Sequence, residues 1–248
     1  DQSMSNSSMA TDASAQIRRI KILKTAPHAC SYLEGEQSTT AFVDPELVIE
    51  ASLYTRLAEI GFRRSGPYLY TPMCGTCSAC IPTRVVVQQF TQNRAQKRCM
   101  KQNDDIDVQQ RQAIDTAEHY PLYENYINER HKDGDMYPPS RDQFEQFLGA
   151  TWECTQYFEF RIAGKLIGCA VVDVLPDSLS AIYTYFDPSL NKRGLGNFAI
   201  LFQISLAAKL NKPYVYLGYW IENCQKMSYK KKYQPMEFFK QNSWELSE

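Results

Sequence analysis

The chain has 248 residues, of which 44% are hydrophobic and 22% charged, and these proportions exclude a wholly disordered or collagen-like protein. Its 27 Lys and Arg residues are balanced by 28 Asp and Glu residues, which leaves a net charge of -1. A uniformly basic coat for nucleic acid is therefore excluded, and a polyanion would have to bind a local basic patch. The length fits one large domain or two small ones, and no apolar run approaches the ~18–20 residues of a membrane-spanning helix.

The N-terminal segment is polar and rich in Ser and Ala, without the apolar core of a signal peptide. We interpret residues 1–16 as a disordered or expression-derived tail and expect a cytoplasmic protein. The chain has eight cysteines, and in the reducing cytoplasm these are not expected to form a disulfide framework.

Periodicity in the first hundred residues predicts a small α/β unit. Apolar residues alternate in the strands, and they recur at helical spacing after Asp44-Pro45, a pair typical of a helix start. The predicted elements are a strand at 17–23, a helix from Asp44-Pro45 that ends at Gly61, a short strand at 68–70 and a strand at 84–90.

A cysteine turn separates the last two of these strands. Cys74, Cys77 and Cys80 form Cys-x-x-Cys-x-x-Cys, and Cys30 follows His28 upstream. Together these side chains could supply four soft ligands for zinc or an iron–sulfur cluster. Reduced thiols packed in a tight turn, or redox sensing by disulfide formation, are the alternatives that remain open.

The acidic residues 103–108 mark a predicted boundary, after which the order of elements changes. Ser140 is a helix N-cap, and residues 163–164 form the turn of a hairpin. The predicted elements are helices at 108–131 and 141–148, strands at 157–162, 166–174 and 179–186, a loop at 187–193, a helix at 195–210 and a strand at 214–217.

An antiparallel meander followed by a crossover helix and a further strand resembles the core order of GNAT-type acyltransferases. The loop before the crossover helix also resembles the phosphate-binding loop of that fold, since Arg193, Gly194 and Gly196 would offer a cation and exposed backbone N–H groups at a helix N-terminus. Asn191 departs from the usual pattern, and a glycine-tightened turn is the alternative. The fold class is therefore α/β (α+β), with an N-terminal cysteine-containing α/β domain at 17–105 and a GNAT-like acyltransferase domain at 106–248.

Two stretches hold the charge asymmetry that the net charge conceals. Residues 216–233 interleave aromatic residues with four lysines, and residues 81–103 hold five cations and no acid. Alternating cations and rings can hold phosphate and stack a base, which indicates binding of an anion such as an RNA end with salt-dependent affinity. A solvated lysine face over a buried aromatic stripe is the alternative.

Five segments together resemble the aminoacyl-tRNA–protein transferase family over nearly the whole chain. They are residues 25–33, 73–85, 134–136, 216–221 and 226–230. Members move an amino acid from aminoacyl-tRNA to the N-terminal amine of a protein that begins with Asp or Glu and so mark it for degradation. The resemblance in length and in the cysteine turn is to the short bacterial branch, which uses leucyl-tRNA. The eukaryotic branch uses arginyl-tRNA and has a Cys-x-x-Cys pair where this chain has His28 and Cys30.

The resemblance implies aminolysis of an activated ester, for which positioning provides most of the acceleration and no cofactor is required. We expect the aminoacyl end in a cleft where strands 183–186 and 217–220 separate. Tyr185 and Tyr219 would then donate to the oxyanion or relay a proton, and Asp187 or Glu222 would accept the amine proton. For both tyrosines, packing in the core is the alternative.

The remaining roles follow from the same resemblance. Arg84 and Tyr70 are assigned to the acidic acceptor, because a bidentate Arg suits a carboxylate. The residues assigned to aminoacyl-tRNA are Arg193, Gly194, Gly196, Trp220, Lys226, Tyr229 and Lys230.

Two other functions compete with this interpretation. One is a GNAT acetyltransferase that uses acetyl-CoA, and the other is a non-catalytic zinc-ribbon adaptor that binds acidic protein ends or RNA.

Overall fold

The computed structural model describes residues 19–149 and 152–247, so the predicted tail at 1–16 lies outside the described residues. Its largest element is an eight-stranded mixed sheet in the order β14-β13-β7-β12-β11-β10-β9-β8. Those strands are β7 (Ile81–Val86), β8 (Asp107–Arg111), β9 (Thr155–Ile162), β10 (Lys165–Val174), β11 (Ser178–Phe186), β12 (Tyr214–Trp220), β13 (Met236–Lys240) and β14 (Ser243–Leu246).

A four-stranded antiparallel sheet lies beside it, and a two-stranded ribbon lies in the same N-terminal part. In chain order these strands are β1 (Ile22–Lys24), β2 (His28–Ala29), β3 (Gln37–Ser38), β4 (Thr40–Val43), β5 (Arg63–Ser65) and β6 (Tyr68–Pro72).

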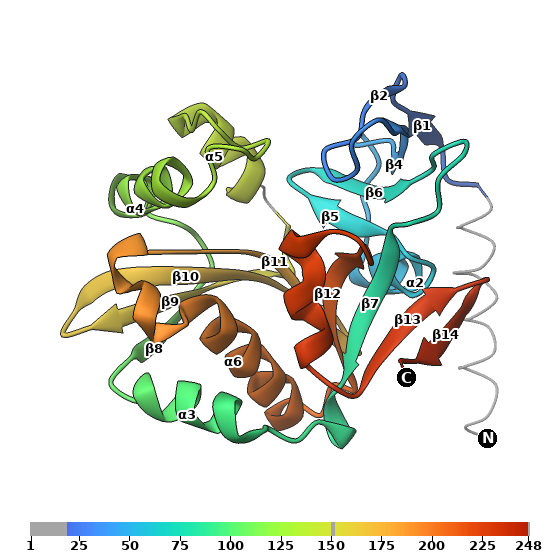
Figure 1. Cartoon of the computed structure of the whole chain (residues 1–248). Helices are drawn as coiled ribbons and strands as arrows, with labels where there is room; N and C mark the ends of the chain where they lie inside the picture. The colour runs from blue at the N-terminus through green and yellow to red at the C-terminus, as the bar shows by residue number, and fades with distance from the viewer. Residues whose placement is uncertain (1–18, 150–151, 248) are drawn as a thin grey trace, which may run out of the picture.

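Helices cover both faces of the large sheet (Figure 1). In that view α4, α5 and the small sheet lie above it, and α3 and α6 lie below. The α-helices are α2 (Ala51–Glu59), α3 (Arg94–Gln102), α4 (Thr116–Arg130), α5 (Arg141–Leu148) and α6 (Leu195–Lys209). Three 3₁₀ helices are η1 (Val87–Gln89), η2 (Pro188–Arg193) and η3 (Gln225–Lys232).

The centre of the large sheet contains a fork. Strands β11 and β12 are parallel and are connected through α6. They pair only where Ser178–Ser180 of β11 lie beside Tyr214–Tyr216 of β12. Beyond that point β11 continues beside β10, and β12 continues beside β7. The structure thereby confirms the predicted meander, crossover helix and parallel strand. It also confirms that the strand before the crossover helix and the strand after it separate. We call residues 181–186 and 217–220 the two branches of the fork.

A buried ion pair fastens the small sheet to the large one. The guanidinium of Arg64 in β5 makes two bonds to the carboxylate of Asp173 in β10, of 2.7 and 2.8 Å. Tyr54 and Thr155 donate to the same carboxylate. The side chains of the ion pair are at most 1% exposed, so the position of β5 relative to β10 is closely determined.

Several predicted elements are confirmed, among them the Ser140 cap of α5 and the hairpin of β9 and β10. The predicted helix at 108–131 is wrong in its first part, where β8 pairs with β9 and α4 begins only after Asp115. Asp44 is also not the helix cap: it accepts the N–H of Glu46 in a turn, and α2 begins at Ala51. At β8, long-range pairing overrides local periodicity. At Asp44 the chain forms a local turn before α2 begins.

Two further differences affect the N-terminal region. Helix α3 was not predicted, because it has few apolar residues, although Asn93 and Gln96 form a capping box at its start. Strand β7 lies inside the large sheet between β12 and β13. The predicted boundary near residue 105 therefore does not separate the two sheets.

Candidate functional site

The branches of the fork are partly open to solvent, although the paired strand segments before them are buried. Residues 181–184 are half-buried, and so is Gly218 between buried neighbours. Arg63 of β5 reaches into this point: its Nη1 donates to Ser180 Oγ at 2.9 Å and its Nη2 to the Ala181 carbonyl at 2.8 Å. Both acceptors are neutral.

Lys230 enters the fork from η3. Its side chain is 7% exposed, and its Nζ donates to the carbonyl of Tyr219 at 2.5 Å. Burial, followed by the charge of Arg63, lowers the pKa of Lys230 to about 7. An anion bound beside Lys230 would therefore favour its charged form near neutral pH.

Gly218 forms the floor between the two cations. Its φ is +88°, which favours glycine, and it lies where the register between β12 and β7 shifts. A Cβ at Gly218 would lie 3.4 Å from Lys230 Nζ and 3.7 Å from Arg63 Nη2. Both cationic heads therefore lie beside this half-buried glycine, whose missing side chain leaves what we call the open position of the fork.

No carboxylate of residues 19–149 or 152–247 forms an ion pair with either cation. The other buried arginines differ in this respect, since Arg64 has Asp173 and Arg84 has Glu237. Among the described residues, the fork therefore brings together two buried basic side chains that no carboxylate pairs.

Tyrosines line this region. The Tyr219 hydroxyl donates to the Gly61 carbonyl at 2.7 Å, and the Tyr219 ring lies 6.0 Å from that of Tyr70. Burial raises the pKa of Tyr70, while Arg63 opposes this rise. Two of the predicted site residues, Tyr70 and Tyr219, are thus brought to the fork together with Lys230.

Tyr185, in contrast, is placed in a buried network behind the fork. It is 0% exposed, and its hydroxyl lies 2.6 Å from His119 Nδ1. His119 Nε2 lies 2.6 Å from Glu159, which Arg161 also pairs. Together with Glu118, His119 and Glu159 form the group of described side chains with ligand atoms close enough for a metal ion. The arginine contacts already compensate these carboxylates.

The other predicted catalytic carboxylates lie at the ends of the two branches. Asp187 follows β11 and caps η2, accepting both the N–H and the hydroxyl of Ser189. Glu222 follows β12 and is exposed. Trp220 at the end of β12 is buried, and Lys231 lies 4.3 Å above its ring.

Arg84 lies away from the open position of the fork. Its Nε donates to Glu237 at 2.6 Å, and its guanidinium stacks on Tyr214 and Trp244 at 3.6 and 4.1 Å. These contacts occupy the group that the sequence assigned to the acceptor.

The glycine loop before α6 is packed against α3. Arg193 makes a two-bond ion pair with Asp105, and its carbonyl accepts from Asn103. Gly194, with φ +62°, is the N-cap of α6, and a Cβ there would lie 3.6 Å from the thiol of Cys99. A Cβ at Gly196 would meet only the Phe186 ring. The predicted cation of the loop is therefore already paired within the protein.

The two basic stretches meet at α3 and η3. Gln96 of α3 donates to the Lys232 carbonyl of η3 at 2.9 Å. We call the exposed cations of these two helices the basic surface: Arg94, Lys97, Arg98, Lys101, Lys231 and Lys232. Of the other predicted residues, Lys226 pairs with Asp133 at 2.7 Å, and the Tyr229 ring lies 5.9 Å from Lys230 Nζ. Helix η3 thus connects the basic surface to the fork.

The cysteine turn lies near the same region. Burial, and then Cys30, Cys74 and Cys77, raise the pKa of Cys80 to about 11. Cys30 Sγ accepts the backbone N–H groups of Tyr32 and Leu33, both at 3.4 Å. Within the described part of the chain, however, no three cysteine sulfurs lie within 4.8 Å of one another. His28 is exposed, and its Nδ1 lies 3.1 Å from the Ala26 carbonyl.

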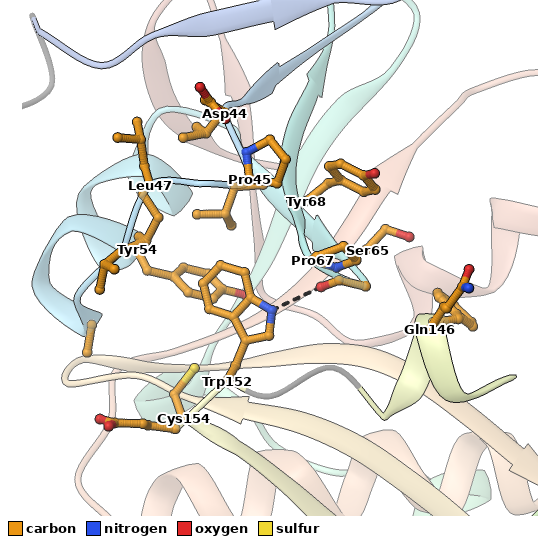
Figure 2. A pocket seen from close by; sticks show the side chains of 18 of the residues that line it. Asp44, Pro45, Leu47, Tyr54, Ser65, Pro67, Tyr68, Gln146, Trp152 and Cys154 are labelled. Atoms are coloured by element: carbon orange, nitrogen blue, oxygen red, sulfur yellow. Dashed lines mark hydrogen bonds between the residues drawn. The ribbon is translucent and has the colours of Figure 1, made fainter. Parts of the chain in front are cut away.

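A groove of about 1230 Å³ lies between the small sheet and α5. Figure 2 shows Trp152 in it, bonded to the Gly66 carbonyl, with Tyr68 and Gln146 on its walls. Its lining includes four acids and no Lys or Arg. Phe147 in this lining packs edge-on against Tyr183 of the fork, with ring centres 5.2 Å apart. The four acids are Asp44, Glu50, Glu145 and Glu153. This groove is unsuited to the phosphates of RNA.

Fold and site together define a mixed α/β protein with a GNAT-like acyltransferase order. Residues 28–98 match the family model for the N terminus of arginine-tRNA-protein transferase, and residues 118–240 match the model for its C terminus. The chain belongs to the aminoacyl-tRNA–protein transferase family, whose members are aminoacyltransferases.

Similar proteins cover nearly the whole chain. It is 52% identical over 229 residues to the aspartate/glutamate leucyltransferase of Saccharophagus degradans, with 92% of this chain and 97% of the relative covered. Identity to the enzyme of the same name from Teredinibacter turnerae is 50%, with 92% and 95% covered. Identity to that of Pseudomonas aeruginosa is 49%, with 92% and 97% covered.

Solved structures with a similar arrangement are distant. The C-terminal domain of a putative lysylphosphatidylglycerol synthetase from Agrobacterium fabrum is 11% identical, with a TM-score of 0.45 and coverage of 78% of this chain and 71% of that one. FemX is 7% identical, with a TM-score of 0.46 and coverage of 87% and 83%. Among the described residues, the model has no helix long and apolar enough to span a membrane.

Arg63 was not among the site residues predicted from the sequence. The signal was the adjacent pair Arg63-Arg64 in a short strand, which places one cation on each face. Asp173, near the end of an apolar strand, is the partner of Arg64 and not of Arg63.

Proposed function

We propose that this protein transfers leucine from leucyl-tRNA to the N-terminal amine of proteins that begin with Asp or Glu, and so creates a degradation signal. The relatives named aspartate/glutamate leucyltransferase support the donor and the acceptors. The observation that carries the proposal in this chain is that η3 presents Lys231 and Lys232 outward and Lys230 into the fork. A tRNA held on the basic surface would have its aminoacyl end beside the buried cations.

The reaction needs two ends to meet. The α-amine of the acceptor attacks the leucyl carbonyl, a C–N bond forms, and the bond from that carbonyl to the tRNA 3′ oxygen breaks. The amine proton goes to the departing oxygen. Because the α-amino pKa is about 7.7–8.0, a sizeable neutral fraction exists at neutral pH, and holding the ends at the fork provides most of the rate.

The side chains assigned to this step remain proposals. Tyr219 borders the fork and would orient the acceptor. Asp187 or Glu222, at the ends of the branches, would take the amine proton and pass it to the departing oxygen. Tyr185 would act only through the network of His119, because its hydroxyl is buried.

An aminoacyl-transfer assay tests the proposal. Purified protein receives labelled leucyl-, phenylalanyl- or arginyl-tRNA with peptides that begin with Asp, Glu, Lys or Ala. We expect transfer from leucyl-tRNA to the Asp and Glu peptides alone. Transfer from arginyl-tRNA only, or equal transfer to all four peptides, would contradict it. The acetyl-CoA alternative predicts thermal stabilisation by coenzyme A, whereas we expect none.

We further propose that ligands from Cys30, Cys74, Cys77, Cys80 and His28 hold a structural zinc ion or iron–sulfur cluster. Cys30, Cys74 and Cys77 all lie close enough to Cys80 to raise its pKa, which supports this grouping. No step of the transfer passes through this group. Metal and sulfide analysis of anaerobically purified protein tests it, with Cys77→Ser expected to lose the metal and Cys169→Ser to retain it. Metal-free protein of full thermal stability would contradict it.

A further inference from the structure

Arg63 and Lys230 are two buried basic side chains, and within residues 19–149 and 152–247 no carboxylate forms an ion pair with either. Buried cations without a counter-ion are strongly unfavourable, and proteins normally pair them, as this one pairs Arg64 and Arg84. The absence of an acid beside Arg63 and Lys230, among the residues that the structure describes, indicates that an anion completes the site when a substrate binds.

The two side chains retain hydrogen-bond donors for such an anion. A guanidinium has five N–H groups and an ammonium has three. Arg63 uses two of its groups on Ser180 and Ala181, and Lys230 uses one on the Tyr219 carbonyl. Lys230 Nζ and the Nη2 and Nε atoms of Arg63 lie 3.4, 3.7 and 3.8 Å from the point where a Cβ of Gly218 would stand, so donors of both side chains lie beside this half-buried glycine.

The shape of this position favours a carboxylate over an RNA phosphate. A phosphodiester carries a ribose on each side, whereas the carboxylate of Asp or Glu ends a short arm. Both cations are at most 7% exposed, so an entering anion must be small and terminal. The exposed cations of the basic surface are available to phosphates instead.

We propose that Arg63 and Lys230, above Gly218, bind the side-chain carboxylate of the acceptor's N-terminal Asp or Glu. This inference rests on the proposed function and assigns its acceptor specificity to named residues. A neutral Asn or Gln at the acceptor terminus would leave both cations uncompensated and is therefore rejected. Only one or two methylene groups and the α-carbon separate that carboxylate from the acceptor's α-amine, which would therefore stay at the solvent side of the fork.

The experiment measures leucyl transfer to two peptides that differ only in the first residue, Asp or Asn. The wild-type protein should prefer Asp by about 100-fold or more in kcat/KM for the peptide, as expected when charged hydrogen bonds are lost. Lys230→Gln should reduce that preference about 10- to 100-fold, chiefly through KM for the Asp peptide. Arg63→Lys keeps the charge and tests whether the planar guanidinium is needed; we expect a smaller loss of preference.

Lys165→Gln is the matched control, because Lys165 is an exposed lysine at the start of β10, far from the site in sequence and of the same charge. It should keep the wild-type preference, and thermal unfolding should show all variants folded. If Lys230→Gln keeps the Asp preference, the inference is overturned while the proposed function stands. A raised KM for leucyl-tRNA with unchanged acceptor preference would assign the cations to phosphate and also overturn it. No transfer by the wild type to any peptide would overturn the proposed function itself.

Discussion

Replacing Lys230 by Met should make the protein more stable. In the folded protein burial and the neighbouring Arg63 lower the pKa of this ammonium from 10.5 to about 7, and Cys80 and Cys224 offset this only in part. The folded state therefore binds the proton less tightly than the unfolded chain does. Below pH 7 the protein has to hold a charge that its interior disfavours.

The magnitude follows from the two pKa values. At about 1.36 kcal/mol per pKa unit, the lowered pKa costs about 5 kcal/mol of folding stability below pH 7. Removing the ammonium leaves the Tyr219 carbonyl without its donor, which costs about 1–3 kcal/mol. Met has a similar length, so we expect a net gain of about 2–4 kcal/mol, or roughly 5–15 °C in Tm for a chain of this size.

The assay is urea or thermal unfolding of both proteins from pH 6 to pH 10. The wild type should gain on the variant as pH rises from 7 towards 10.5, because over that range the unfolded chain binds more protons at this site. Comparing the two proteins cancels the other titrating groups. Equal or lower stability of Lys230→Met at pH 6, or an advantage that does not shrink by pH 10, would refute the reasoning.

Three other substitutions have defined outcomes. Gly218→Ala places a methyl group at positive φ between the two cations, so it should cost about 1–2 kcal/mol and reduce transfer to Asp peptides more than it affects KM for leucyl-tRNA; unimpaired transfer would contradict the placement. Lys231→Ala with Lys232→Ala should raise KM for leucyl-tRNA and lower its salt dependence by a slope of about 1.4–1.8, and an unchanged slope would remove them from the tRNA surface. Asp173→Asn should cost about 3–5 kcal/mol in unfolding experiments, because it leaves Arg64 buried without a charged partner, and a neutral effect would show that other contacts hold the small sheet.

The order of elements in the C-terminal half was predictable because local signals and long-range packing agree there. Ser140 caps α5 in the structure as its sequence context indicates, and the alternating residues of β9 and β10 form the predicted hairpin. Local periodicity and long-range packing disagree at β8. There the pairing with β9 determines the structure, so the helix predicted over residues 108–115 was wrong.

The site was predictable only in part, because a side chain's role depends on partners far away in sequence. The sequence assigned Lys230 to the aminoacyl-tRNA, Tyr70 to the acceptor and Tyr219 to catalysis, and the fold brings these three side chains to the fork. Arg84 has the same chemistry as Arg63, but Glu237 lies beside one and not the other, and nothing local to either arginine indicates this. The choice between them needs the fold.

We propose that the acidic side chain of the acceptor binds in the fork, and a crystal structure of the protein with a peptide that begins with Asp would test this. We expect the side-chain carboxylate of that Asp within about 4 Å of both Arg63 and Lys230, above Gly218. A peptide whose carboxylate lies elsewhere, with those two cations still uncompensated, would contradict it.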